Sequence, residues 1–308
     1  MLHSWIVKAL VQKLVSFLPF KHQINFFFQK RITRGVELTD LYFTDRLIHI
    51  RNHVKYYQEI TGKSIPEKTL ELGTGWYPVI PIYLFLRGVN SIYSIDIANH
   101  IRKNYTRRTI KKFLLELDGN KIFAEKECFI SERIAQLRSV SSNTSISEQE
   151  MLTSLGISAS VGDVKNDSFD DEFFDLIHSN NTFEHINPDE LKQILVAFER
   201  MLKKGGVMSH FIDMTDHFAH FDRSITIYNF LRFSQKEWSC IDNSIQPQNR
   251  LRVTDYVNIY NDLCINNRIE ELRPGNPEEV KSLHLNELYS NYPVERLAVS
   301  HCQLISSK

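Results

Sequence analysis

Hydrophobic and polar positions follow two different periods along the first third of the chain. Residues 40–62 repeat apolar side chains at helical spacing and end at a glycine, which predicts a helix. A short apolar segment at 68–75 runs into a glycine turn, residues 79–88 have a second helical pattern, and residues 91–98 read as a strand. The pattern therefore predicts a β-α-β unit with a ligand-binding turn after its first strand.

The alternation of strands and helices continues towards the C-terminus. A charged segment at about 100–155, with a Ser-rich loop at 139–150, predicts a helical insertion that is too long for a simple crossover. We further predict strands at 157–164, 173–181, 207–214, 268–274 and 295–305, a helix at 189–202 followed by a KKGG turn, and a helical stretch at 222–262. This order predicts an α/β fold with a doubly wound, seven-stranded, mostly parallel sheet.

The N-terminal segment, residues 1–35, combines an apolar stripe with basic residues and contains no acid. Helical spacing places its large apolar residues on one side, namely Trp5, Ile6, Leu10, Leu14, Phe17 and Leu18. No run reaches the roughly 18 apolar residues of a membrane span, and no signal-peptide cleavage site is recognisable, so a cytoplasmic protein is expected. Two interpretations stay open for residues 1–62. In the first, these residues form a helical lid on the main domain at 63–308, and the breadth of the stripe favours this interpretation. In the second, they form a segment that lies at the membrane surface.

Charge and cysteine content narrow the classes of function. Lys plus Arg and Asp plus Glu are balanced at 37 each among 308 residues, which argues against a nucleic-acid partner. The four cysteines are far apart and form no C-x-x-C pair, a poor signal for zinc or for a disulfide framework. We therefore expect reduced, structural cysteines.

The segment LELGTGWYP carries the strongest chemical signal. Gly73 and Gly75 allow the backbone to approach a ligand, and Asp96 at the end of the next strand can accept both hydroxyls of a ribose. Glu71 would repel a pyrophosphate but is tolerated beside a cationic sulfonium and ammonium. Tyr77 stands where a dinucleotide turn would have its third glycine. Helix capping by Glu71 or Asp96 is the structural alternative.

The order of these motifs resembles that of the class I S-adenosylmethionine-dependent methyltransferases, over about residues 68–214. The matching pieces are LELGTG, SIDIA, VGDV, FDLIHSNNTFEHI and LKKGGVMSHFID. The resemblance implies a Rossmann-like fold and S-adenosylmethionine as the cofactor. The cofactor residues that it implies are Glu71, Gly73, Thr74, Gly75, Asp96, Ile97, Asp163, Val164, Ser179 and Asn180. It also implies that Asp163 binds the adenine amino group, unless that residue is a simple turn former, and that Ser179 and Asn180 line the methionine end.

Histidines near the predicted strand ends are the candidates for catalysis. Methyl transfer depends mainly on positioning, and a base is needed chiefly when the acceptor is a hydroxyl. His185 follows the cofactor-lining residues and is the first candidate, with His210 as the second and His217 further along. The structural alternative for His185 is a loop histidine that is hydrogen-bonded to the backbone. A metal site from His210, Asp213, Asp216 and His217 is not predicted, because strand periodicity separates His210 from Asp213.

The predicted function is methyl transfer to a small-molecule, sugar or lipid-linked glycan acceptor, at a hydroxyl. Two alternatives remain: a non-catalytic S-adenosylmethionine-binding scaffold or regulatory protein, and a nicotinamide-dependent oxidoreductase. The neutral net charge favours none of the classes that act on nucleic acids.

Overall fold

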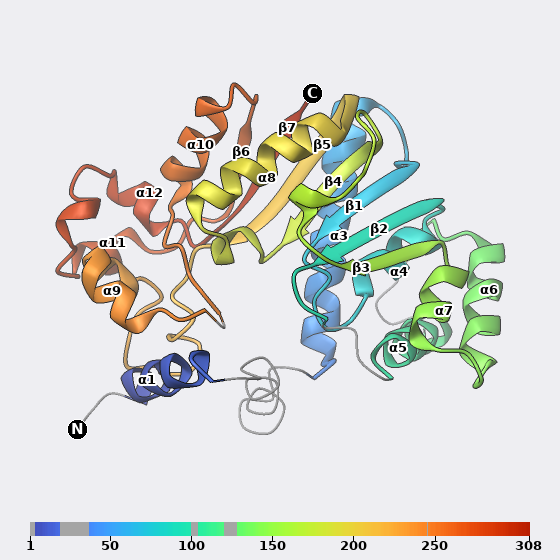
Figure 1. Ribbon diagram of the computed structural model, residues 1–308, viewed down its shortest axis with the longest axis horizontal. Helices are drawn as coiled ribbons and strands as arrows, with labels where there is room; N and C mark the ends of the chain where they lie inside the picture. The colour runs from blue at the N-terminus through green and yellow to red at the C-terminus, as the bar shows by residue number, and fades with distance from the viewer. Residues whose placement is uncertain (1–3, 19–36, 100–103, 120–127, 245) are drawn as a thin grey trace. The chain divides into compact units, whose positions relative to one another are not determined.

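One seven-stranded sheet organises the chain, with the strand order β3-β2-β1-β4-β5-β7-β6 (Figure 1). The computed structural model describes residues 4–18, 37–99, 104–119, 128–244 and 246–308. The strands are β1 (Lys68–Leu72), β2 (Ser91–Asp96), β3 (Ile157–Val161), β4 (Phe174–Asn180), β5 (Leu202–Asp213), β6 (Arg268–Arg273) and β7 (His301–Ser307). β1 runs parallel to β2 and β4, and β2 runs parallel to β3. The predicted fold class is confirmed.

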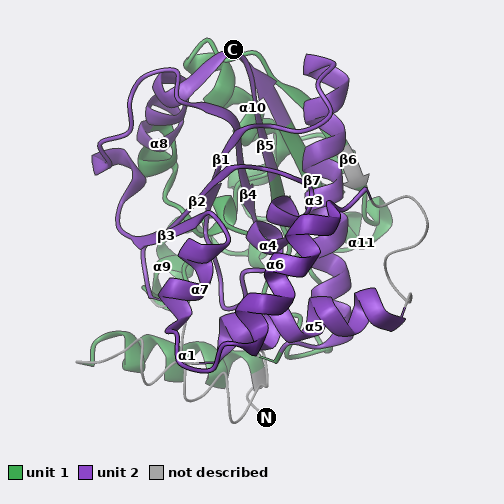
Figure 2. Cartoon of the chain, turned by 90° about the vertical axis from the view of Figure 1, so that its right-hand side faces the viewer, with its two compact units in different colours: residues 1–37, 181–192, 211–304 green, residues 38–180, 193–210, 305–308 purple. Residues whose placement is uncertain are grey.

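The chain divides into two compact units that are each built from several segments (Figure 2). Unit 1 comprises residues 1–37, 181–192 and 211–304. Unit 2 comprises residues 38–180, 193–210 and 305–308, so β5 and β7 contribute residues to both units. The division that we predicted at residue 62 stays a prediction.

Helices on both sides of the strands complete unit 2. They are α3 (Asp40–Thr61), α4 (Val79–Leu86), α5 (Tyr105–Gly119), α6 (Ser131–Ser142), α7 (Glu148–Ser154), the 3-10 turn η1 (Val164–Asn166) and most of α8 (Pro188–Met201). α3 packs on β4 and α4, and α4 packs on β2 and β3, while α8 covers the other face (Figure 1). Every residue of α4 is buried, which agrees with its uninterrupted apolar sequence.

Local capping explains why α3 has the predicted boundaries. The Thr39 side chain accepts a hydrogen bond from the Tyr42 amide, and Gly62 ends the helix in the left-handed region with φ of 70°. These are the residue types that satisfy free backbone groups at helix ends. The long helical insertion is also present, as α5, α6 and α7, but the loop between the last two is shorter than the Ser-rich segment suggested, because α6 extends to Ser142.

Unit 1 contains one helix of 13 residues, α1, and several short elements. They are α1 (Ser4–Ser16), η2 (Phe183–His185), η3 (Asn229–Arg232), α9 (Gln235–Ile241), α10 (Val253–Asp262), α11 (Pro277–Lys281), η4 (Glu287–Tyr289) and α12 (Val294–Ala298). The predicted helical stretch at 222–262 is present only in part, as η3, α9 and α10 separated by irregular segments. The fully buried Arg252 guanidinium instead donates to the carbonyls of Met214, Leu297 and Val299, so irregular backbone is tied into the core.

Two further predictions of local structure are wrong. The KKGG segment is part of β5 and not a turn, because the Gly205 amide donates to the Lys308 carbonyl at 2.8 Å and the chain end supplies a ladder partner. The predicted strand at 295–305 begins as helix α12, which follows Pro293 and buries Leu297 and Ala298. β7 starts only at His301.

α1 is held to unit 1 by the side opposite to its exposed apolar stripe. Trp5 and Ala9 enter a buried cluster that includes Phe218 and Trp238, and the Trp5 amide donates to Asp222 Oδ2 at 3.0 Å. The exposed stripe consists of Val7, Leu10, Val11, Leu14, Phe17 and Leu18, with Leu14 68% and Phe17 75% exposed. The prediction that Trp5 shares a side with Leu14 is wrong, because nine residues at 100° each place them on opposite sides.

The described helices contain none that is both long enough and apolar enough to cross a membrane.

Candidate functional site

The glycine turn after β1 is held against the end of β2 by backbone hydrogen bonds. Gly73 and Gly75 have φ of 88° and 65°, in the region that L side chains rarely adopt. The Gly73 amide donates to the Ile95 carbonyl at 2.8 Å, and the Gly75 amide donates to Asp96 Oδ2 at 3.2 Å. Asp96 Oδ1 also accepts from the Ala98 amide at 3.0 Å. The carboxylate is thus fixed at the strand end, with acceptor capacity left for hydroxyl donors.

Glu71 lies in a buried polar network at the same strand ends. Ser94 Oγ donates to Glu71 Oε2 at 2.9 Å and lies 2.7 Å from Thr74 Oγ1. Burial raises the pKa of Glu71 to about 8, although the Ser94 hydrogen bond and Arg46 act in the opposite direction. A carboxyl with so high a pKa would be stabilised in its ionised form by a cationic ligand.

Sequence reasoning missed Ser94, although a register argument would have found it. Ser94 is the Cα partner of Glu71 across the parallel β1–β2 pair. Its side chain therefore shares a sheet face with Glu71.

Tyr77 replaces the third glycine of a dinucleotide turn for a packing reason. It is 3% exposed, stacks on Tyr105 with ring centroids 4.8 Å apart, and meets Tyr42 edge-on at 5.9 Å. The aromatic side chain therefore closes the core of unit 2 behind the turn.

The residues predicted at the adenine lie at the ends of β2 and β3. Ile97 is 80% exposed and follows Asp96, whereas Val164 is buried. The Asp163 carboxylate accepts from the Lys165 amide at 3.0 Å and caps η1, which is the turn-forming role considered above. That role leaves the proposed adenine contact of Asp163 compatible with the fold, because one carboxylate accepts several hydrogen bonds.

Ser179 and Asn180, at the end of β4, are fixed by buried histidines of unit 2. His210 Nδ1 lies 2.8 Å from Ser179 Oγ, and His53 Nε2 lies 3.0 Å from Asn180 Oδ1. Burial lowers the pKa of His53 to about 4 and that of His210 well below the usual range. His210, our second catalytic candidate, is fully buried and stacks on Phe198, so its geometry supports a role in positioning Ser179.

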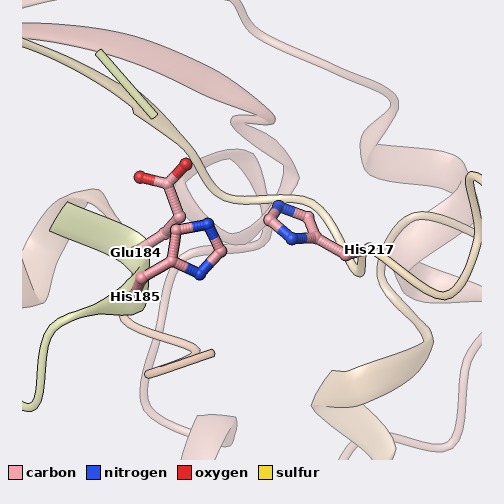
Figure 3. Close-up of side chains that lie close together, drawn as sticks. All are labelled: Glu184, His185 and His217. Carbon is pink, nitrogen blue, oxygen red and sulfur yellow. The ribbon is translucent and has the colours of Figure 1, made fainter. Parts of the chain in front are cut away.

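Three ligand-type side chains of unit 1 converge: Glu184, His185 and His217 (Figure 3). One oxygen or nitrogen atom from each lies within 4.8 Å of the other two. Figure 3 shows the two imidazole rings next to each other, with the Glu184 carboxylate beside His185, and the ring planes are inclined by 65°. Their ring centroids are 5.1 Å apart. We call this set the Glu-His-His cluster.

The neighbours of the cluster are polar and charged. His185 Nδ1 lies 2.7 Å from the Pro247 carbonyl, so this nitrogen carries the proton. Burial chiefly, and His217 in addition, lower the pKa of His185 to about 4. His217 Nε2 lies 3.6 Å from Asp213 Oδ2. Burial alone would raise the pKa of Asp213, but His217 and His301 hold it well below its usual range.

The quartet considered from the sequence is not the set that converges. Among the residues that the structure describes, His217 is joined by Glu184 and His185. Asp216 instead accepts from the Phe218 amide and from Asn229 within its own turn. The Glu184 contribution was missed, although it directly precedes His185 in NTFEHI.

A hollow in unit 1 lies next to His217. Its lining residues are Lys8, Gln12, His217, Phe218, Trp238, Asp242, Gln246 and Gln248. Two of these, Lys8 and Gln12, come from α1, and most of the others carry polar groups. The hollow has room for about one water molecule, so it marks a polar surface beside His217 and not a preformed pocket for a large ligand.

Comparison with known proteins supports the chemistry that this fold suggests. The family model described as a methyltransferase domain matches residues 134–209. No curated protein matches the sequence.

Similar solved structures include three that cover most of this chain. The PH0226 protein from Pyrococcus horikoshii OT3 is 14% identical with a TM-score of 0.45, over 88% of this chain and 92% of that one. Geranyl diphosphate C-methyltransferase from Streptomyces coelicolor A3(2) is 10% identical with a TM-score of 0.43, over 83% and 77%. Haemonchus contortus phosphoethanolamine N-methyltransferase 2 is 12% identical with a TM-score of 0.45, over 84% and 52%.

The family match includes β3, β4 and α8 and part of β5. The strand order and the glycine turn between β1 and α4 extend the agreement towards the N-terminus. Residues 134–209 therefore match a methyltransferase domain, within a sheet whose strand order agrees with a Rossmann-like, S-adenosylmethionine-dependent methyltransferase.

Proposed function

We propose that this methyltransferase acts at a membrane surface, on a hydroxyl of a sugar-like head group carried by a lipid. The observation that supports this acceptor is the placement of α1. Its Lys8 and Gln12 lie beside His217, and the outer side of the same helix exposes the apolar stripe. One helix thus combines contacts for a polar head group with a surface for a lipid phase.

The residues of unit 2 fit S-adenosylmethionine by their chemistry. The buried Glu71, with its raised pKa, suits a ligand that brings a cationic ammonium. Asp96 is proposed to bind the ribose hydroxyls, while Ile97 and Val164 flank the adenine and Asp163 binds its amino group. Ser179 and Asn180 are proposed to hold the methionine end, oriented by His210 and His53.

When bound, S-adenosylmethionine supplies a methyl group on an activated sulfonium. Held by Glu71, Asp96 and the end of β4, the donor would give its methyl carbon to the acceptor oxygen and keep the electron pair of the broken carbon–sulfur bond on sulfur. The hydroxyl proton leaves, and His185 is our candidate to receive it at Nε2, because Nδ1 is bound to the Pro247 carbonyl. With a pKa of about 4, His185 alone is a weak base at neutral pH, so the proton is expected to leave late.

The basic N-terminal segment supports an anionic membrane as the surface in question. Residues 1–36 contain Lys8, Lys13, Lys21, Lys30, Arg31 and Arg34 and no acid. Each basic residue near an anionic surface contributes about 1 kcal/mol. The lid alternative requires the exposed stripe of α1 to be covered by the protein itself.

Vesicle co-sedimentation of the full chain tests the membrane part. We expect binding to phosphatidylserine-containing vesicles that weakens at high salt. The double change Leu14→Glu with Phe17→Glu should abolish it. Leu115→Glu, on α5, is the matched control because Leu115 is also 68% exposed. Binding that is absent in the unmodified chain, or equal in both variants, would favour the lid.

Labelled methyl donor tests the acceptor. The protein is incubated with methyl-labelled S-adenosylmethionine and either a membrane lipid extract or the water-soluble metabolites of a cell extract. We expect label in the lipid fraction. Label in the water-soluble fraction alone would indicate a free small-molecule acceptor, and release of no S-adenosylhomocysteine with either would support the scaffold alternative.

A further inference from the structure

We propose that the Glu-His-His cluster binds a divalent transition-metal cation. Glu184 and His185 belong to η2, and His217 follows β5, so two separate chain segments supply the donors. Metal bonds of about 2.1 Å at tetrahedral angles separate neighbouring donor atoms by about 3.4 Å. The donor atoms lie within 4.8 Å of one another, so side-chain rotations that move them by about 1 Å would bring them to this separation.

Three consecutive residues hydrogen-bond to the three residues that carry the candidate ligands, one of them through a side chain. The Pro247 carbonyl accepts from His185 Nδ1 at 2.7 Å, Gln248 Oε1 accepts from the His217 amide at 3.1 Å, and the Asn249 amide donates to the Glu184 carbonyl at 2.9 Å. Asn249 Nδ2 adds bonds to the carbonyls of Phe183 and Ile186 at 2.7 and 2.9 Å. The segment 247–249 thus contacts Glu184 and His185 on one side and His217 on the other.

The contact between His185 and Pro247 has the form of those found behind metal-binding histidines. A histidine that ligates through one ring nitrogen usually donates its other N–H to a carbonyl or carboxylate, which fixes the ring orientation. His185 does so towards Pro247, and its Nε2 is then the nitrogen for a cation. The Asp213 carboxylate lies 3.6 Å from His217 Nε2 and 3.5 Å from His301 Nε2. A negative charge next to the cluster favours a bound cation.

The donor set selects the class of cation. Two imidazoles and one carboxylate suit manganese, iron, cobalt or zinc better than magnesium or calcium, which prefer oxygen donors. Three protein ligands leave at least one coordination position open. Resting on the proposed function, the acceptor hydroxyl would take that position, where the cation lowers its pKa. With a cation bound, His185 Nε2 would be a ligand and would not receive the proton, which would leave to water.

Cobalt titration of the metal-stripped full chain tests the site without methyl transfer. We expect saturation at about one equivalent, with visible absorption bands of nitrogen-ligated cobalt. Glu184→Gln and His217→Ala should each weaken binding at least about a hundredfold, because losing a ligand costs more than the 10–100-fold effect of losing a residue that only orients a ligand. His284→Ala, an exposed histidine of the same unit, is the matched control and should bind cobalt normally.

Two results would overturn the site. One is an unmodified chain that shows no saturable binding or only the spectrum of hydrated cobalt. The other is unchanged cobalt affinity in both variants while S-adenosylhomocysteine still binds and shows that they are folded. Where a variant does not fold, the spectrum of the unmodified chain decides. One-equivalent binding in a chain that transfers no methyl group would support the site and contradict the proposed function.

Discussion

Replacing Glu71 by glutamine should change the pH dependence of stability in the absence of cofactor. The pKa of Glu71 is about 8 in the folded chain, against an ordinary value of 4.5. Between these pH values the unfolded chain has lost the proton and the folded chain retains it, so the free energy of unfolding falls as pH rises. At about 1.4 kcal/mol per pH unit, the loss is about 3 kcal/mol at pH 7 and about 5 kcal/mol above pH 8.

Glutamine resembles the protonated acid in shape and does not titrate. Urea unfolding at pH 5, 7 and 8.5 should therefore show Glu71→Gln gaining several kcal/mol relative to the unmodified chain as pH rises. Glu59→Gln, at an exposed acid of α3, is the control for the surface charges. Stability curves that stay parallel for the unmodified chain and Glu71→Gln would refute the raised pKa.

The same carboxyl should link cofactor binding to proton release. S-adenosylhomocysteine keeps the ammonium of the donor, and an ammonium beside Glu71 favours the ionised acid. Affinity should therefore rise about tenfold per pH unit up to pH 8, where the acid of the free protein ionises. Calorimetry in two buffers of different ionisation enthalpy should show nearly one proton released at pH 7, and none in Glu71→Gln. If the unmodified chain and Glu71→Gln released the same number of protons, the ammonium would not lie beside Glu71.

Three further predictions concern the other site and core residues. Asp96→Asn should weaken S-adenosylhomocysteine binding by about 1.5–3 kcal/mol in calorimetry, through lost charge-assisted hydrogen bonds, and unchanged affinity would exclude the ribose assignment. His185→Ala should lower turnover about a hundredfold or more and leave cofactor affinity intact, whereas a parallel loss of cofactor binding would make His185 structural. Tyr77→Ala should lower the free energy of unfolding by about 3–5 kcal/mol, with Tyr77→Phe as the mild control. A loss below about 1 kcal/mol would contradict the core role of Tyr77.

Local rules made the β-α-β unit and its boundaries predictable from the sequence. The helix Asp40–Thr61 is flanked by Thr39 and Gly62, whose capping roles depend on backbone groups only a few residues away. The glycine turn was recognisable for the same reason, since Gly73 and Gly75 adopt conformations that few other residues tolerate. These features require no knowledge of distant partners.

Tertiary contacts decided which side of α1 is covered. Periodicity identified apolar positions in α1, but Trp5 is buried by Phe218 and Trp238, which are more than 200 residues away in the sequence. The pattern contains no information about where such partners lie. It therefore did not show that the stripe ending at Leu18 stays exposed.

The Glu-His-His cluster shows most clearly which features the sequence determines and which depend on tertiary contacts. The sequence determined that NTFEHI follows the cofactor-lining strand, and so made His185 a candidate. Only the fold brings His217 to His185 and places Pro247, Gln248 and Asn249 against the cluster. Pro247 is about 60 residues after His185 in the sequence. Spacing along a strand or helix predicts neighbours within one element, whereas this site depends on side chains that meet because separate segments share one core.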